Sequence, residues 1–123
     1  MGAATKAFGE YFHGLRIATG KTLRKFCQDH GLDASNASKM ERGLLVPPYE
    51  TLERYAKCLR LKESSNEWFT LFDLAAAARG EIPADILSDE DLLASLPVVF
   101  RTIRGEKLTP EQIDELIKMI REA

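Results

Sequence analysis

The chain has 123 residues, of which 45% are hydrophobic and 29% charged, and its formal net charge at pH 7 is −2. This composition suits one small domain, or a domain with an extension, and the longest apolar run is far too short to cross a bilayer. The N-terminus lacks the basic start and apolar run of a secretory signal, so we expect a cytoplasmic protein with no membrane partner.

The small net charge hides a difference between the two halves of the chain. Residues 1–62 carry 11 lysines and arginines and 6 acidic residues, a net +5, whereas residues 63–123 carry 6 and 13, a net −7. A basic half favours an anionic partner, and an acidic half favours a different role. A random scatter of charge over two solvated surfaces is the alternative interpretation.

The spacing of apolar residues is typical of helices along nearly the whole chain, and hairpin signals are absent, so we expect an all-α fold. The first helix is predicted at about residues 6–19 and the second at about residues 23–30. Thr22 is a good N-cap for the second helix, and Gly31 ends it because glycine adopts a left-handed backbone at little cost. The apolar face of the first helix is predicted to consist of Phe8, Phe12, Leu15 and Ala18.

Asp33 is predicted to cap a third helix at about residues 34–42, and two prolines precede a fourth helix at about residues 49–59. Where the third helix ends, Glu41 and Arg42 are expected to pair with each other or to cap it. The side chains expected to be buried on these two helices, or just beyond the third, are Ala37, Met40, Leu44, Tyr49, Leu52, Ala56 and Leu59.

A fifth helix is predicted to begin after Ser65 and to end at Gly80. It carries more apolar surface than one narrow stripe, so part of it faces either the core of the monomer or a second subunit. Together these elements predict a five-helix bundle as one domain at residues 1–80. Residues 81–123 are then expected to form an acidic helical extension that serves dimerisation or partner docking.

The extension itself contains three predicted segments. The acidic stretch SDEDLLASL predicts a short helix that starts at Ser88, and Pro97 interrupts or restarts it. The sequence of residues 98–105, VVFRTIRG, fits either a helix or an extended segment, and we favour a helix. Thr109, followed by a proline and by Gln112, has the pattern of a helix start. The apolar residues of this terminal helix are Ile113, Leu116, Ile117 and Ile120.

The stretch TLRKFCQDHGLDASNASKMERG, residues 22–43, has the length of two short helices joined by a turn with a single glycine. The run DASNAS opens the second helix with small polar residues, several of which are poor helix formers. This arrangement is typical of a helix-turn-helix, whose second helix lies in the DNA major groove. We therefore predict that double-stranded DNA is the partner of this stretch.

The second helix of the motif offers side chains suited to base edges. Asn36 can form paired hydrogen bonds with an adenine, Ser35 can donate or accept, and Ala34 can contact a thymine methyl group. Lys39, about one turn further on, can reach a guanine or a phosphate. The N–H groups at residues 22–24 can also hold a phosphate. The cations that border this surface are predicted to attract phosphates: Lys21, Arg24, Lys25 and Arg42.

Residues 8–61 resemble the helix-turn-helix domain of the lambda-repressor and Cro-like (XRE) regulators. The stretches LRIATGKTLRKFCQDHGLDASNASKMERG and PPYETLERYAKCLRL follow the family order, and SKMERG…P…ETL is the most specific part. Leu23 and Ala34 stand where the family usually has glutamines, and Cys27 and His30 where it usually has alanine and leucine. These departures bear on the operator and leave the fold intact. The resemblance implies base contacts from Ala34, Ser35, Asn36 and Lys39, and backbone contacts near Thr22, Ser38 and Arg42.

We expect a sequence-specific transcriptional regulator, a repressor that binds an inverted-repeat operator as a homodimer, because one short helix contacts too few base pairs for specificity. One alternative is an antitoxin of the same fold, whose acidic C-terminal region binds a toxin. Another is a protein-interaction adaptor that does not bind DNA.

No catalytic arrangement, metal-ligand spacing or glycine-rich phosphate loop stands out, so we expect neither an enzyme nor a metal or cofactor site. Cys27 and Cys58 are predicted to be buried reduced thiols, with a redox switch as the alternative. His13 and His30 lack ligand spacing and are expected at helix surfaces or boundaries.

Overall fold

The computed structural model describes residues 2–105, 109–112, 114 and 118, and in these it contains helices and no strand. The prediction of an all-α fold is therefore confirmed for the part of the chain that is described. The chain divides into two compact units, one that ends at Glu81 and one that begins at Ile82. Each unit is considered by itself below.

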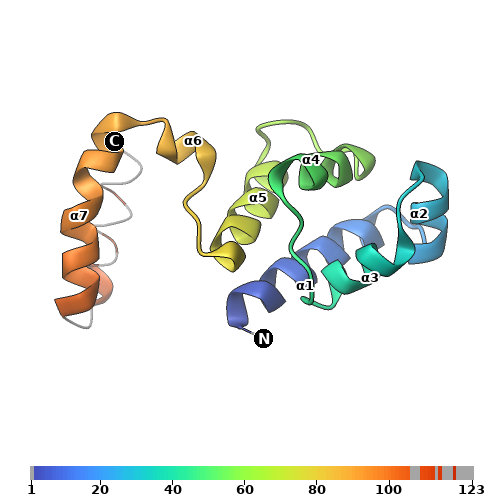
Figure 1. The fold of residues 1–123 in the computed structure, drawn as a ribbon, viewed down its shortest axis with the longest axis horizontal. Coiled ribbons are helices and arrows are strands. Elements are labelled where there is room, and N and C mark those ends of the chain that lie inside the picture. The colour runs from blue at the N-terminus through green and yellow to red at the C-terminus, as the bar shows by residue number, and fades with distance from the viewer. Residues whose placement is uncertain (1, 106–108, 113, 115–117, 119–123) are drawn as a thin grey trace. The chain divides into compact units, whose positions relative to one another are not determined.

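The first unit is built from five helices (Figure 1). Their bounds are α1 Ala3–Ala18, α2 Leu23–His30, α3 Ala34–Glu41, α4 Tyr49–Cys58 and α5 Asn66–Arg79. Local sequence sets the starts of α2, α3 and α5, because the hydroxyl or carboxylate oxygen of the residue before each helix accepts the backbone N–H three positions later. Thr22 accepts from Lys25 at 3.1 Å, and Asp33 and Ser65 cap α3 and α5 in the same way. Gly31 and Gly80 end α2 and α5 in the left-handed region, as predicted.

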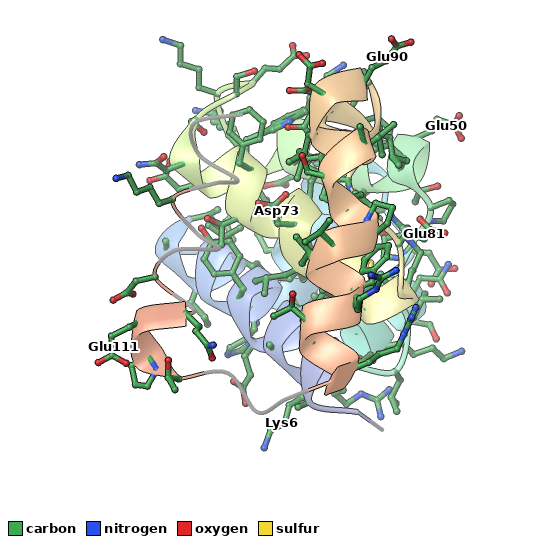
Figure 2. All side chains as sticks on the ribbon, turned by 90° about the vertical axis from the view of Figure 1, so that its left-hand side faces the viewer. Lys6, Glu50, Asp73, Glu81, Glu90 and Glu111 are labelled. Atoms are coloured by element: carbon green, nitrogen blue, oxygen red, sulfur yellow. The ribbon has the colours of Figure 1, made fainter. Side chains whose placement is uncertain are left out.

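The core of this unit lies around α1, which packs against α3 and α5, while α2 packs on α3 and α4 on α5. Burial of each large apolar side chain is worth about 1.5–3 kcal/mol, so this shared core supplies most of the driving force for folding. Charged side chains of this unit such as Lys6 and Glu50 point away from the ribbon (Figure 2). The largest fully buried side chains are Phe8, Phe12, Phe26, Met40, Leu52 and Leu71.

Three side chains predicted to be buried are exposed, and each lies at the end of an element. Ala18 is the last residue of α1, where the chain turns toward α2. Leu44 is 52% exposed because Gly43, with φ of 73°, turns the chain away from α3, and Leu45 and Val46 pack on the core instead. Tyr49 is 48% exposed because it opens α4 and only one side of its ring meets Phe72, with 4.9 Å between the ring centroids.

The second unit contains α6, Ala84–Leu87, and α7, Glu90–Gly105, which pack against each other. The predicted start at Ser88 is wrong, because the backbone of Ser88 closes the end of α6 and the Asp89 carboxylate accepts the N–H of Leu92 to cap α7. The predicted interruption at Pro97 is also wrong. α7 runs through this proline, whose φ is already helical and whose missing N–H costs one hydrogen bond.

The expected helical character of residues 98–105 is confirmed, since they belong to α7. Thr109 and Gln112 form the predicted reciprocal cap, with distances of 2.9 and 3.2 Å. The four apolar residues predicted for the terminal helix lie outside the described residues. Among the residues described, no helix has the length and apolar character needed to cross a membrane.

Candidate nucleic-acid interface

α3 has one buried face and one exposed face, and the predicted base-contacting residues lie on the exposed one. Ala37 and Met40 are fully buried against the rest of the bundle. Ala34, Ser35, Asn36 and Lys39 are exposed, and Ser38 is half-buried between the two faces. No hydrogen bond within the described residues engages the side-chain amide of Asn36, so both its donor and its acceptor face solvent. The exposed face of α3 therefore presents small polar groups and one cation to a partner.

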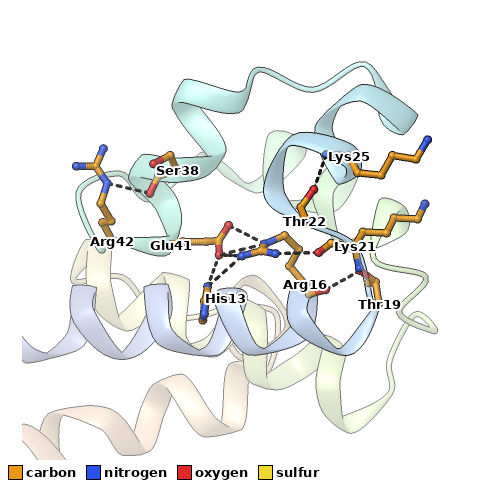
Figure 3. Close-up of polar contacts among 9 residues, drawn as sticks. All are labelled: His13, Arg16, Thr19, Lys21, Thr22, Lys25, Ser38, Glu41 and Arg42. Atoms are coloured by element: carbon orange, nitrogen blue, oxygen red, sulfur yellow. Dashed lines mark hydrogen bonds and ion pairs between the residues drawn. The ribbon is translucent and has the colours of Figure 1, made fainter.

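The predicted phosphate-binding residues lie at the two ends of this face. Lys21 and Thr22 lie at the start of α2, whereas Arg42 follows the end of α3 (Figure 3). Arg24 is the second residue of α2. The oxygen of the Thr22 hydroxyl accepts the N–H of Lys25 as the cap of α2, and this bond does not use the O–H donor of the hydroxyl. The Nε of Arg42 lies 3.4 Å from the carbonyl oxygen of Ser38 and donates to it, which folds the arginine back over the last turn of α3.

Asp29 partly neutralises the cations at the start of α2. Its carboxylate oxygens lie 2.7 Å from Nζ of Lys21 and 3.0 Å from Nζ of Lys25. Hydrogen bonds from Lys21 and then from Lys25 lower the pKa of Asp29 to about 2. The pairing therefore favours the folded state above about pH 4 and is lost as the pH falls toward 2. At neutral pH both lysines share their charge with this carboxylate.

Removal of the Asp29 charge should strengthen binding to DNA at this surface. We expect Asp29→Asn to bind a duplex several-fold more tightly, and to steepen the plot of log affinity against log salt by about 0.9, equivalent to one more neutralised phosphate. Fluorescence anisotropy across a KCl series measures both quantities. Glu63→Gln removes the same charge from the α4–α5 connection and serves as the control. Equal affinities and salt slopes for the two variants would show that the charge of Asp29 does not weaken DNA binding.

A buried ion pair between α1 and α3 fixes the position of α3. The Nε and Nη2 atoms of Arg16 lie 3.0 and 2.8 Å from the carboxylate oxygens of Glu41, and the two side chains are 8% and 7% exposed. The Nη1 of Arg16 donates to the carbonyl oxygen of Lys21 at 2.9 Å. One guanidinium therefore holds the end of α3 and the residue that precedes the cap of α2 (Figure 3). Glu41 therefore pairs with Arg16 and not with Arg42, whereas the alternative expectation, that the end of α3 is capped, is met by the bond from Arg42 to the carbonyl oxygen of Ser38.

His13 extends the same cluster toward solvent. Its Nδ1 is bonded to a carboxylate oxygen of Glu41 and lies 3.3 Å from Nη2 of Arg16. The prediction that His13 lies on a helix surface is confirmed, since half of its side chain is exposed. Sequence reasoning missed its partner and missed Arg16 altogether, since an arginine on an amphipathic helix gives no local sign of burial.

Gly9 brings α1 into backbone contact with the end of α3. A Cβ at this position would lie 2.8 Å from the carbonyl oxygens of Met40 and Glu41, and 2.7 Å from the backbone nitrogen of Gly43. Real Cβ atoms do not approach that closely, so only glycine fits without displacing α3. Gly9, His13 and Arg16 follow helical spacing, and together they make α1 the support on which α3 rests.

The two cysteines are free and lie away from the exposed face of α3. Cys27 is buried, as predicted, whereas Cys58 is only half-buried and this part of the prediction is wrong. Cys58 comes at the C-terminal end of α4, where the helix leaves the core. Burial raises the pKa of both thiols, which keeps them protonated at neutral pH. In the part of the chain that is described, no group of three histidines, cysteines or acids is placed to hold a metal.

Comparison with protein-family models matches residues 7–67 to the family described as helix-turn-helix domain. Comparison with curated proteins and with solved structures finds no significant match. The matched range begins within α1, contains α2, α3 and α4, and reaches the start of α5. A domain of this kind suggests a DNA-binding regulator, which is consistent with the resemblance to the lambda-repressor and Cro-like regulators. Residues 7–67 therefore form a helix-turn-helix domain.

Proposed function

We propose that this protein is a sequence-specific transcriptional regulator, a repressor in the cytoplasm, that inserts α3 into the DNA major groove. The observation that carries the proposal is the exposed face of α3, where small polar residues and Lys39 lie opposite a fully buried face. Their small size lets the helix backbone approach the base edges closely. The role is one of binding and not of catalysis.

The proposed contacts divide into base contacts and phosphate contacts. Asn36 pairs with an adenine, Ala34 lies against a thymine methyl group, and Ser35 and Lys39 supply adaptable polar contacts. The phosphates on either side are bound by Lys21, Thr22, Arg24, Ser38 and Arg42. The buried Arg16–Glu41 pair supports this assignment because it holds the two ends of the surface in a fixed relation.

The proposed binding species is a homodimer on an inverted repeat, with half-site centres about 34–36 Å apart. Each good bidentate base contact contributes only about 1–3 kcal/mol, so a single α3 gives too little discrimination. Phe69 on α5 is 39% exposed, and Tyr49 at the start of α4 leaves half of its ring in solvent beside Phe72. These aromatic side chains support a dimer surface on α4 and α5, and light scattering that detects only monomer, with and without DNA, would contradict it.

The Asn36 side chain should govern sequence preference, whereas Lys39 should govern affinity. We expect Asn36→Ala to reduce the preference for a specific fragment over a scrambled one by about 5- to 150-fold, the equivalent of 1–3 kcal/mol. Lys39→Ala should weaken binding to both fragments and reduce its salt dependence. The measurement is a titration of a labelled fragment from the region upstream of the gene, at two salt concentrations.

Asn66→Ala is the matched control, because Asn66 is an exposed asparagine at the start of α5. Its sequence preference should equal that of the unmodified protein. Weak binding that is equal on every fragment, and unaffected by Asn36→Ala, would contradict sequence-specific DNA recognition by α3. That result would instead favour an adaptor that docks proteins.

An antitoxin is the second candidate function, and the acidic half of the chain favours it. Val98, Phe100 and Ile103 on α7 are exposed, and residues 63–123 carry a net charge of −7. A basic toxin with an apolar groove would complement both features. Purification from the native operon tests this candidate, and recovery of the protein without a bound neighbour would count against it.

A further inference from the structure

The first unit contains a hollow of about 400 Å³ on the side of the helix-turn-helix. It lies between the end of α1, the helix α2 and the end of α4. Phe26 and Leu59 are buried side chains that form part of its lining, and Leu15 and Leu61 are half-buried lining residues packed on the core. A hollow of this volume is at the lower end of the range for small-molecule sites.

Another part of the lining is polar, since Thr19 and His30 line the hollow beside two cations. Lys21 and Arg60 both line the hollow, and among the described residues no aspartate or glutamate does. The nearest acids lie outside it: Asp29 pairs with Lys21, and Glu50 and Glu53 line a neighbouring hollow that shares Arg60. A lining that joins apolar side chains to polar groups and positive charge is complementary to a small amphipathic anion.

Arg60 is the cation most available to such a ligand. No hydrogen bond or ion pair of its guanidinium forms within the part of the chain that is described. Its φ is 61°, a left-handed conformation that an arginine rarely adopts and that glycine or asparagine would occupy more easily. Its backbone N–H donates to the carbonyl oxygen of Lys57, so the loop is closed onto α4 and holds the arginine at the border of the hollow.

We propose that this hollow binds a small carboxylate with an apolar body, such as a medium-chain fatty acid. The apolar body lies against Phe26 and Leu59, and the carboxylate is bound by the guanidinium of Arg60 with Lys21 beside it. A planar guanidinium matches the two oxygens of a carboxylate, which distinguishes this ligand from an alcohol of the same length. Binding is non-covalent, because a free carboxylate has no leaving group that the thiol of Cys58 at this hollow could displace.

A bound carboxylate would also weaken DNA binding, and this step rests on the proposed function. Lys21 is one of the residues assigned to a phosphate, and its carbonyl oxygen is held by Arg16. A carboxylate beside Lys21 competes with the phosphate for its charge. The expected effect is a loss of affinity for every DNA sequence and a decrease of about 0.9 in the salt slope, equivalent to one phosphate contact.

The test is calorimetric titration of the full chain with sodium octanoate below its micelle concentration, and with 1-octanol as the uncharged probe. Arg60→Asn removes the charge and keeps a residue that tolerates the left-handed backbone. Lys62→Gln removes an exposed charge two residues away and is the matched control. We expect saturable one-to-one binding of octanoate, weakened roughly fivefold by Arg60→Asn and by replacement with 1-octanol, and unchanged in Lys62→Gln.

Absence of saturable octanoate binding would overturn the proposal, as would equal affinity for octanoate and 1-octanol or insensitivity to Arg60→Asn. Anisotropy titrations with DNA, with and without octanoate, then separate the two claims. Octanoate binding without any DNA binding would contradict the proposed function and leave the ligand site standing. Specific DNA binding by a protein that does not bind octanoate would support the function and reject the site.

Discussion

Replacement of Arg16 by methionine should lower the free energy of unfolding by about 3–5 kcal/mol, because it leaves the carboxylate of Glu41 buried without its main partner. The same change removes the bond to the carbonyl oxygen of Lys21. The total stability of a small domain is about 5–15 kcal/mol, so the variant should lie close to the limit of folding. Urea denaturation followed by circular dichroism measures the difference.

Two companion variants identify the buried charge as the cause. Arg24→Met replaces an exposed arginine of α2, and it should change the stability by less than about 0.5 kcal/mol. The double variant Arg16→Met with Glu41→Leu removes both charges, and it should be more stable than Arg16→Met alone. Additive losses in the double variant would show that the two side chains do not act as a pair.

Gly9→Ala should also destabilise the protein strongly, by about 3 kcal/mol, which is the upper part of the range for overpacking a core. The added methyl group would meet backbone atoms of Met40, Glu41 and Gly43 at 2.7–2.8 Å, and backbone cannot rotate away as a side chain can. α1 and α3 would have to separate, which would disturb the ion pair beside them. Thermal or urea unfolding gives the size of the loss.

Gly14 offers the matched control, because it lies in the same helix and a Cβ there has no neighbour within 4 Å. Gly14→Ala should stabilise the protein by about 0.5–1 kcal/mol, since alanine favours the helix more than glycine does. The two alanine substitutions are therefore expected to have opposite signs. A Gly9→Ala variant as stable as Gly14→Ala would contradict the close contact between α1 and α3.

The helices of the first unit could be predicted because their starts and ends depend on residues close in sequence. Thr22, Asp33 and Ser65 cap α2, α3 and α5 through bonds that span three residues. Two errors show what these local rules leave out. Tyr49 follows the helical pattern of α4 but opens the helix, where the core covers only one side of its ring. Pro97 is a helix breaker by local rules, yet α7 accommodates it.

The exposed face of α3 was also predictable, because Ala37 and Met40 mark its buried side by helical spacing. The ion pair that holds α3 in position could not be predicted. Arg16 and Glu41 lie 25 residues apart and meet only after α1 has packed on α3. The bond from Lys25 to Asp29 has the spacing of a helical ion pair and could have been anticipated. The bond from Lys21 to the same carboxylate depends on the turn before α2, which local patterns do not define.

The role of α3 as the DNA-reading helix is tested most directly by selecting bound duplexes from a random-sequence pool with the full chain, and again with Asn36→Ala. We expect an enriched inverted repeat whose half-site centres are about 10–10.5 base pairs apart. Asn36→Ala should lose the preference at one symmetry-related position in each half-site and keep the others. A selected pool without a common motif would contradict the assignment of α3 to base recognition. The same motif with both proteins would contradict the assignment of Asn36 to a base contact.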